Sequence, residues 1–179
     1  AVAILVEYRV SSTHGTSPME AVSDARSALR WVRYNSEILN IDPTRIVAAG
    51  GSGGAHLALA AAMIPGCADD PHDPNITCVP NGLILYCPVV DTSKKGFGQD
   101  KFNTPDDANK ANPSKYIGKH LPPMIIFHGT QDRIVPFESV ARFAKQVTRK
   151  ANVCQMIAFD CKDNTFYNFN VSAEGYDMT

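Results

Sequence analysis

Apolar and polar residues succeed one another along the chain in blocks that predict alternating strands and helices. Continuous apolar runs, each expected to form a buried strand, occupy residues 1–10, 45–50, 82–90, 123–129 and 153–159. Amphipathic or alanine-rich stretches, each expected to form a helix, occupy residues 19–39, 55–64 and 137–150. Strands that are apolar throughout are typical of a parallel sheet covered on both faces. The pattern therefore predicts an α/β fold in which helices cover both faces of a mostly parallel sheet.

The polar residues that could carry chemistry follow the predicted strands. In a parallel sheet, functional side chains lie in the loops at the carboxyl ends of the strands, and three of those ends fall near residues 50–52, 128–132 and 159–164. Residues 91–122 are polar and irregular, and a loop of that length inside a domain is more often functional than idle. Asp91 at its start is either a substrate-side residue or a turn cap.

One serine stands among four glycines in the segment AAGGSGGAHLALA, at residues 48–60. A flexible linker would have polar, irregular flanks, whereas these flanks are a predicted strand and a predicted helix. A P-loop needs a lysine after its last glycine, and none follows here. The dinucleotide-binding pattern G-x-G-x-x-G also fails, because its third glycine would stand at His56. The pattern that fits is G-x-S-x-G between a strand and a helix.

This pattern is typical of a nucleophile elbow, a tight and strained turn that presents a reactive serine. Ser52 would be the nucleophile. Gly50, Gly51 and Gly54 would let the strand and the helix approach closely, because glycines have no side chains. The backbone N–H of Gly53 would donate a hydrogen bond to an oxyanion, helped by the helix dipole. The turn therefore indicates acyl transfer through a serine.

A second candidate residue, Asp132, lies in the segment HGTQDRIVP at residues 128–136, just beyond a predicted strand. An aspartate at this edge of the sheet can orient an imidazole and stabilise its cation. Taken alone, Asp132 could equally be a turn or cap residue. Its position at the same edge as Ser52 favours the acid of a catalytic triad. His128 is expected to support the same loop.

Charge and composition exclude some partners. The chain has 179 residues, of which 44% are hydrophobic and 20% charged, and its net charge is −1. This balance does not favour nucleic acid or an anionic membrane as a partner. No apolar run approaches the ~18 residues that a membrane span needs. The sequence sets no oligomeric state, and the compartment stays open between the cytoplasm and a secreted or periplasmic location.

The five cysteines include no C-x-x-C pair, so they do not indicate a zinc site. Cys67 and Cys78 flank a loop rich in proline and aspartate, and they either form a small disulfide or remain free thiols. The chain begins within an apolar run at Ala1 and stops at Thr179 without a closing helix. We therefore expect a piece of a larger domain.

Several stretches, in register, resemble the esterase and lipase branch of the α/β-hydrolase superfamily, which includes hormone-sensitive-lipase-like and acetyl-xylan-esterase-like proteins. They are VEYRV (6–10), DARSALRWVRYN (24–35), IDPTRIVAAGGSGGAHLALA (41–60), LILYCPVVD (83–91) and PPMIIFHGTQDRIVPFESVARF (122–143). Prolyl-oligopeptidase-like peptidases share the serine turn and the HGxxDxxVP stretch, but the segments DARSALRWVR and IDPTRI are more similar to the esterases. The resemblance implies that residues 1–179 are a single, partial α/β-hydrolase domain.

Carried over residue by residue, the resemblance implies Ser52 as the nucleophile, Gly53 as one oxyanion donor and Asp132 as the triad acid. In that family, a second oxyanion segment of the HGG type precedes the strand that opens this chain, and this sequence does not contain it. The implied partner is a small-molecule ester, and the reaction needs no metal ion and no cofactor.

The expected base is missing from its place. This fold orders its triad as Ser, Asp, His along the chain. None of the five histidines follows Asp132; they are His14, His56, His72, His120 and His128. In the family the base lies in a stretch similar to HGFFN, and NTFYN at residues 164–168 aligns with it, so Asn164 stands in the histidine's place. An asparagine can hydrogen-bond a serine hydroxyl but does not accept its proton near neutral pH. His14 is the remaining candidate for a substitute base.

Three functions are compatible with these residues. The preferred one is a carboxylic-ester hydrolase for small acyl or acetyl esters, including acetylated carbohydrates, that acts through an acyl-enzyme on Ser52 and is impaired by Asn164. The second is a non-catalytic protein of hydrolase fold that binds a ligand or partner in the same pocket. The third is a serine peptidase of the prolyl-oligopeptidase type.

Overall fold

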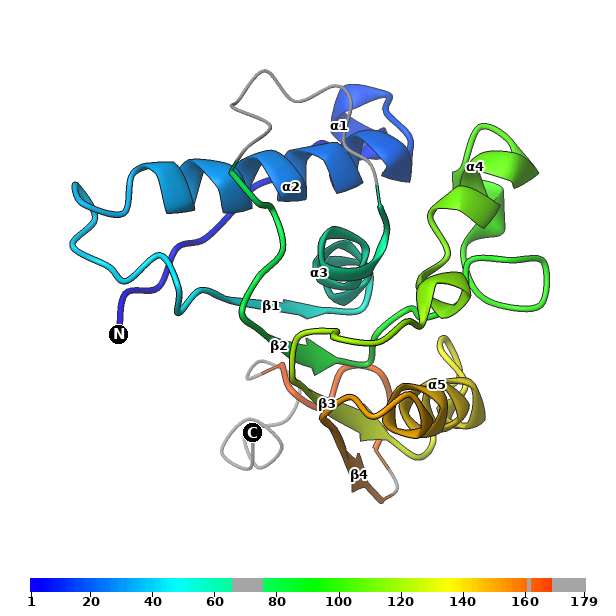
Figure 1. Cartoon of the computed structure of the whole chain (residues 1–179). Helices are drawn as coiled ribbons and strands as arrows, with labels where there is room; N and C mark the ends of the chain where they lie inside the picture. The colour runs from blue at the N-terminus through cyan, green and yellow to red at the C-terminus, as the bar shows by residue number, and fades with distance from the viewer. Residues whose placement is uncertain (66–75, 161, 169–179) are drawn as a thin grey trace.

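A parallel four-stranded sheet lies at the centre of the protein (Figure 1). The structure, a computed structural model, describes residues 1–65, 76–160 and 162–168. The strands are β1 (Val47–Gly51), β2 (Gly82–Tyr86), β3 (Met124–Gly129) and β4 (Cys154–Phe159). They lie side by side in chain order, and each neighbouring pair is parallel. The predicted α/β class with a parallel sheet is therefore confirmed.

Helices precede β1 and also occupy the connections between the strands. They are α1 (Ser11–His14), α2 (Pro18–Tyr34), α3 (Gly53–Met63), α4 (Pro105–Lys110) and α5 (Phe137–Arg149), with short 3-10 helices η1 (Gln99–Lys101) and η2 (Pro113–Tyr116). α2, α3 and α5 are the predicted helices, although α2 ends at Tyr34 and not at residue 39. α2 begins at a capping box, in which Ser17 and Glu20 exchange hydrogen bonds.

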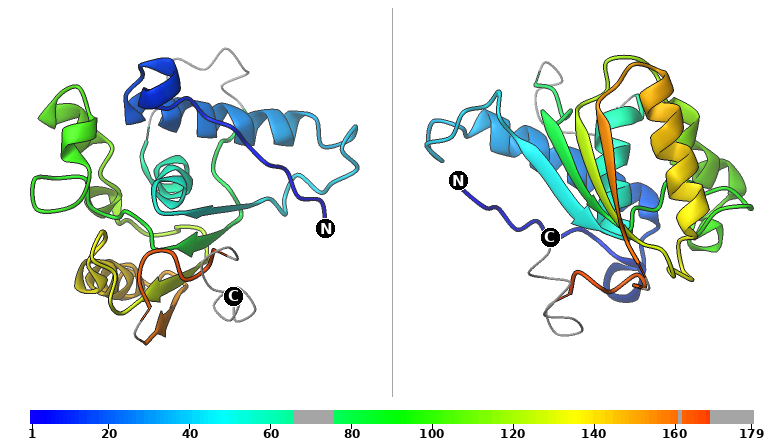
Figure 2. Two further views of the ribbon diagram at one scale, coloured as in Figure 1. Left: turned by 180° about the vertical axis from the view of Figure 1, so that it is seen from behind. Right: turned by 90° about the horizontal axis from the view of Figure 1, so that it is seen from below.

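Different parts of the chain pack on the two faces of the sheet. Side chains of α3 and α5 pack together on one face, against Leu85 and Ile126 of the strands, and both helices lie on that side in Figure 2. On the opposite face, strand side chains pack with Phe166 and Tyr167, which follow β4. The sequence predicted helices on both faces, whereas in the described part of the chain aromatic side chains pack on the second face, and Val47 of β1 stays 54% exposed.

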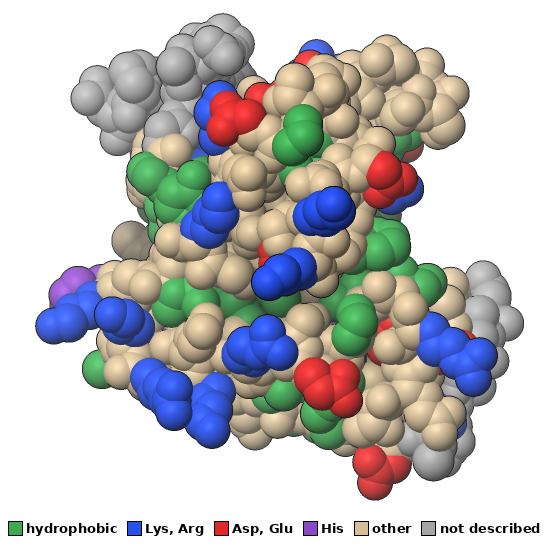
Figure 3. All heavy atoms as spheres, turned by 90° about the vertical axis from the view of Figure 1, so that its right-hand side faces the viewer, with side chains coloured by type: hydrophobic (Ala, Val, Ile, Leu, Met, Phe, Trp, Pro, Cys, Tyr) green, Lys and Arg blue, Asp and Glu red, His purple; other side chains and the backbone are tan. Residues whose placement is uncertain are grey.

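α5 shows how the periodic pattern directs packing. Its residues Val140, Phe143 and Val147 are buried against the sheet, while Arg142 and Lys145 are exposed on its outer side. Figure 3 looks onto this side of the molecule, where lysine and arginine side chains occur over much of the surface. The 3.6-residue repeat of the helix therefore separates the apolar and charged positions of this segment.

Residues 1–10 depart from the prediction. The apolar run predicts a buried strand, but the segment pairs with none of the described strands, and Leu5 is 99% exposed. A groove of about 880 Å3 is lined by this segment, by β1 and by α2. The segment is held to α2, because the backbone N–H and the guanidinium of Arg9 both bind the Asp24 carboxylate. The prediction was wrong because an apolar run becomes a strand only where a neighbour accepts its backbone hydrogen bonds.

Two arginines of α2 are buried, although the amphipathic pattern places them on the polar side. Arg26 is 7% exposed and Arg30 is 6% exposed. The Nη2 of Arg26 donates to the carbonyls of Ala60 (3.3 Å) and Ile64 (2.5 Å) at the end of α3. The last carbonyls of a helix lack donors within the helix and carry the negative end of its dipole. Arg26 therefore caps α3 from the neighbouring helix.

The segment between β2 and β3 is anchored by polar contacts. Asp91 accepts hydrogen bonds from the Ser93 backbone N–H (2.9 Å) and the Asn112 amide (2.7 Å), so it acts as a turn cap. The Nε2 of His56, on α3, bonds the Ala111 carbonyl at 2.7 Å. Burial lowers the pKa of His56, so its ring is neutral and donates this bond. These contacts fix the segment over the start of α3.

Within the described ranges, no helix combines the length and the apolar character that crossing a membrane requires.

Cys78, Cys87 and Cys154 carry free thiols. Cys67, the predicted disulfide partner of Cys78, lies outside the described residues. The free thiol of Cys78 favours the alternative in which the cysteines are unpaired.

Candidate active site

The glycine–serine turn, residues 50–54, joins β1 to α3 through a strained residue. Ser52 has φ 50° and ψ −112°, a backbone conformation of the kind that costs about 1–3 kcal/mol. Its N–H donates to the Tyr86 carbonyl (2.8 Å), and its carbonyl accepts from the His56 N–H (3.1 Å). The sheet and the helix therefore both hold this turn. The Ser52 side chain is half-buried at the N-terminus of α3.

Close packing accounts for two of the glycines in the turn. A Cβ at Gly50 would lie 2.5 Å from the carbonyl carbon of Gly54, so β1 and α3 could not approach as they do. A Cβ at Gly51 would collide with the phenol of Tyr167. At Gly53 and Gly54 a Cβ would meet nothing within 4 Å. The prediction that Gly54 is needed for close approach is therefore wrong, because a side chain there would enter open space.

The carboxylate of Asp132 is oriented by hydrogen bonds from its own loop and from a distant segment. Asp132 follows the end of β3 by three residues and is 6% exposed. Its Oδ1 accepts from the backbone N–H groups of Ile134 (2.9 Å) and Val135 (2.8 Å). Its Oδ2 accepts from the Nδ2 of Asn164 (2.6 Å). Both oxygens are therefore engaged, and the carboxylate has one orientation.

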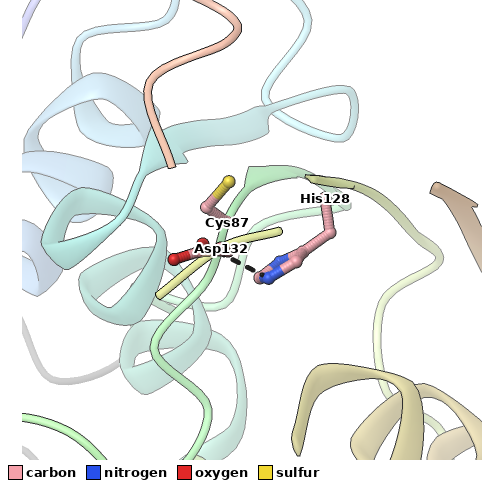
Figure 4. Close-up of side chains that lie close together, drawn as sticks. All are labelled: Cys87, His128 and Asp132. Atoms are coloured by element: carbon pink, nitrogen blue, oxygen red, sulfur yellow. Dashed lines mark ion pairs between the residues drawn. The ribbon is translucent and has the colours of Figure 1, made fainter. Parts of the chain in front are cut away.

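Two further buried side chains lie beside this carboxylate (Figure 4). Ligand atoms of Cys87, His128 and Asp132 all lie within 4.8 Å of one another. The Nε2 of His128 is 3.3 Å from Asp132 Oδ2 and 3.0 Å from the Val135 carbonyl, so His128 supports the loop as predicted. Burial lowers the pKa of His128 and raises that of Cys87 to about 12. The imidazole is therefore neutral, and the thiol keeps its proton.

This cluster combines ligand types that zinc accepts, but the Asp132 oxygens and the Nε2 of His128 already form hydrogen bonds. The part of the chain that the structure describes contains no other such group of three His, Cys, Asp or Glu side chains. The cluster is therefore better described as packing around the Asp132 carboxylate.

One short segment after β4 reaches both parts of the candidate site. Asn164 is buried and bonds Asp132. Three residues later, Tyr167 lies against Gly51, the residue before Ser52. The structure therefore brings Asn164 to the predicted acid, and it brings the same segment to the predicted nucleophile. The sequence assigned no role to Tyr167, because nothing local indicates that its hydroxyl faces a glycine.

The histidines lie elsewhere. His14 accepts a hydrogen bond from the Val10 N–H through Nδ1 (3.2 Å), His120 is exposed before β3, and His72 lies outside the described residues. Among the described residues, no histidine ring forms a hydrogen bond with the Ser52 hydroxyl. The described residues therefore offer no histidine hydrogen-bonded to the serine as a substitute base.

A parallel α/β sheet whose strand leads through a strained serine into a helix is the arrangement of the α/β-hydrolase class. A family profile for the alpha/beta hydrolase fold matches residues 1–114, and a second profile, BD-FAE, matches residues 88–147. The chain belongs to the alpha/beta hydrolase fold family, in its esterase and lipase branch.

Curated relatives are esterases and a xylanase. The chain is 23% identical to the acetylxylan esterase of Xylanibacter ruminicola over 173 residues, which are 90% of this chain and 34% of that protein. It is 24% identical to esterase LipC of Mycobacterium tuberculosis over 166 residues, 82% of this chain and 40% of that protein. It is 28% identical to endo-1,4-beta-xylanase B of Butyrivibrio fibrisolvens over 140 residues, 73% and 22% respectively. The chain thus spans less than half the length of these relatives.

Solved esterase structures share the fold. The apo form of Thermogutta terrifontis esterase 2 has a TM-score of 0.89 and 37% identity, over 96% of this chain and 65% of that chain. Its propionate-bound form has a TM-score of 0.87 and 38% identity, with the same coverage. The described chain therefore has the fold of these esterases over about two thirds of their length.

Proposed function

We propose that this chain is part of a carboxylic-ester hydrolase for small acyl or acetyl esters, including acetylated carbohydrates. The esterase relatives support the reaction class, and the acetylxylan esterase and the propionate-bound esterase support small acyl groups. The Ser52 oxygen bonds to the ester carbonyl carbon, and the Gly53 N–H donates to the resulting oxyanion. The ester C–O bond then breaks, the alcohol departs with the proton that the serine has lost, and water hydrolyses the acyl-enzyme to the acid and free Ser52. Asp132 is the acid of this site. Residues 1–179 belong to a single α/β-hydrolase domain.

The observation that carries the proposal is the strained Ser52 turn at the N-terminus of α3. The 2.6 Å hydrogen bond from Asn164 to Asp132 bears on the rate. In a triad the acid orients a histidine, and that histidine takes the serine proton. Here an amide binds the acid, and an amide does not accept a proton near neutral pH. General-base catalysis typically contributes ~10²–10⁴-fold. The wild-type chain therefore turns esters over slowly, with its nucleophile and acid in place.

Hydrolysis of p-nitrophenyl acetate by the wild type, Ser52→Ala and Asn164→His tests the proposal. We expect slow hydrolysis by the wild type, none above background by Ser52→Ala, and a rise of about 10-fold or more in Asn164→His. Asn164→Gln is the matched control, since it changes the size of the side chain without supplying a base. A Ser52→Ala variant as active as the wild type, or Asn164→His no faster than Asn164→Gln, would contradict the proposal.

A non-catalytic binding protein of the same fold is the second candidate, and Asn164 in the base position favours it. Labelling of Ser52 by a fluorophosphonate, followed by mass spectrometry, separates the two functions. A wild-type chain that is labelled at Ser52 carries a reactive serine, whereas a folded chain that stays unlabelled supports the binding protein. Faster cleavage of dipeptide amides than of esters would favour the peptidase.

A further inference from the structure

We propose that Tyr167 is a positioning residue of this site, whose phenol, seated against Gly51, holds the segment 162–168 on the glycine–serine turn. In that way it fixes the position of Asn164 relative to that of Ser52. The catalytic part of this inference rests on the proposed function, whereas the packing part stands independently of it.

The register of the sheet explains how Tyr167 reaches the turn. Gly51 pairs with Tyr86 across β1 and β2, and paired residues of neighbouring strands point to the same face of a sheet. The ring of Tyr167 packs on the ring of Tyr86, with centroids 5.0 Å apart. Its hydroxyl extends across to Gly51, where a Cβ would collide with the phenol oxygen and two ring carbons. Tyr167 therefore fills the side-chain position that Gly51 leaves empty, directly before Ser52.

The same segment has other fixed points, among them the hydrogen bond from the Gln131 N–H to the Lys162 carbonyl (2.9 Å). Phe166 is 1% exposed, and its ring lies 4.5 Å from that of Phe159 at the end of β4. Asn164 is tied to Asp132 by the 2.6 Å hydrogen bond. On this one face of the sheet, Phe166 thus anchors the segment beside β4, and Tyr167 anchors it beside β1 and β2.

Tyr167 acts through its packing, and not as a base. Burial raises its pKa, and the nearby Cys87 and Asp132 act in the same direction. The phenol is therefore neutral near pH 7 and is able to donate a hydrogen bond, but it is a poor proton acceptor. A neutral aromatic ring with one polar end suits a contact between an apolar sheet face and a half-buried turn.

A double-mutant cycle on thermal stability tests the packing. We expect Gly51→Ala to lower the melting temperature by about 5 °C or more, because the new methyl group collides with the phenol. In a Tyr167→Ala background the same substitution should cost little, since the space is then open. Gly54→Ala is the matched control, because a Cβ there meets nothing within 4 Å and its effect should be equal in both backgrounds. Additive effects of Gly51→Ala and Tyr167→Ala would overturn the proposal.

The positioning role is tested on the rate of fluorophosphonate labelling at Ser52 and on kcat in the Asn164→His background. We expect Tyr167→Ala to lower kcat about 10-fold with KM nearly unchanged, because small misplacements at a reacting centre are costly. Tyr167→Phe keeps the ring and should recover most of the loss. An unchanged kcat and labelling rate in Tyr167→Ala would overturn the positioning role. If Asn164→His is inactive, the proposed function fails, while the stability cycle and the labelling rate still decide this inference.

Discussion

The side-chain amide of Asn164 donates a 2.6 Å hydrogen bond to the carboxylate of Asp132, which lies 32 residues earlier in the chain. Asn164 is 7% exposed and Asp132 is 6% exposed, so water competes little for either group. The bond joins the segment after β4 to the loop after β3. Each partner is therefore sensitive to any change in the charge of the other.

Asn164→Asp should lower stability strongly at pH 8 and much less at pH 5. Two buried carboxylates at this distance cannot both be ionised without a large repulsion. We expect a loss of about 1–3 kcal/mol in the free energy of unfolding at pH 8, measured by urea denaturation, because the hydrogen bond to Asp132 is also lost. At pH 5 a shared proton restores a donor. Asn103→Asp, at an exposed position, is the control; an equal loss at both pH values would count against this account.

Gly50→Ala should destabilise the fold, whereas Gly54→Ala should not. The new methyl group at residue 50 would press on the backbone of residues 54 and 55, which cannot rotate away as a side chain can. Overpacking of this kind costs about 1–3 kcal/mol or more. Gly54 lies in the first turn of α3 with open space around it, so alanine there gains up to about 1 kcal/mol of helix propensity. Equal melting temperatures for the two variants would disprove the close approach of β1 and α3.

Arg26→Met should lower the free energy of unfolding by about 1–3 kcal/mol, since it leaves the carbonyls of Ala60 and Ile64 without this buried donor. Methionine keeps much of the side-chain volume, so the loss reports the polar contact. Arg142→Met, on the exposed side of α5, should change stability by less than about 0.5 kcal/mol. Chemical denaturation of the two variants measures the difference, and similar values would show that Arg26 does not cap α3.

Acid should destabilise the protein partly through His56. Burial puts the folded-state pKa of His56 below its ordinary value of about 6.5, so the unfolded chain binds the proton first as the pH falls. The contribution of neutral His56 to the free energy of unfolding is therefore fully present above pH 6.5. It declines below that pH, by up to about 1.4 kcal/mol per pH unit for one such group. His128 contributes in the same direction, because burial also lowers its pKa.

His56→Gln keeps an N–H that can reach the Ala111 carbonyl but does not titrate. The melting temperature of this variant should therefore fall less between pH 7 and pH 5 than that of the wild type. His120→Gln, at an exposed position, should follow the wild-type profile. Parallel profiles for the wild type and His56→Gln would show that His56 does not drive the acid sensitivity.

The succession of strands and helices was predictable because the pattern of apolar residues records which positions are buried. The amphipathic spacing of α5 and the apolar runs of β2 and β3 are examples. The same rule was wrong for residues 1–10. An apolar run indicates a tendency to be buried, but it does not name the strand that would accept its backbone hydrogen bonds.

In the candidate site, too, some residues could be predicted from the sequence and others could not. The glycine–serine turn around Ser52 and the loop of Asp132 have local signatures, since each depends on a few consecutive residues. The place of Asn164 followed from a resemblance to a family stretch. The roles of Cys87 and Tyr167 had no such signal, because their partners lie on other strands.

The sequence by itself determined the parallel α/β class, the strained turn at Ser52 and the asparagine at position 164, because these depend on periodicity and on consecutive residues. Only the tertiary structure decided that Asn164 bonds Asp132, that Tyr167 fills the space beside Gly51, and that residues 1–10 stay unpaired. Those outcomes depend on which segments, far apart in the sequence, the sheet brings close together in space. No local sequence pattern encodes that proximity.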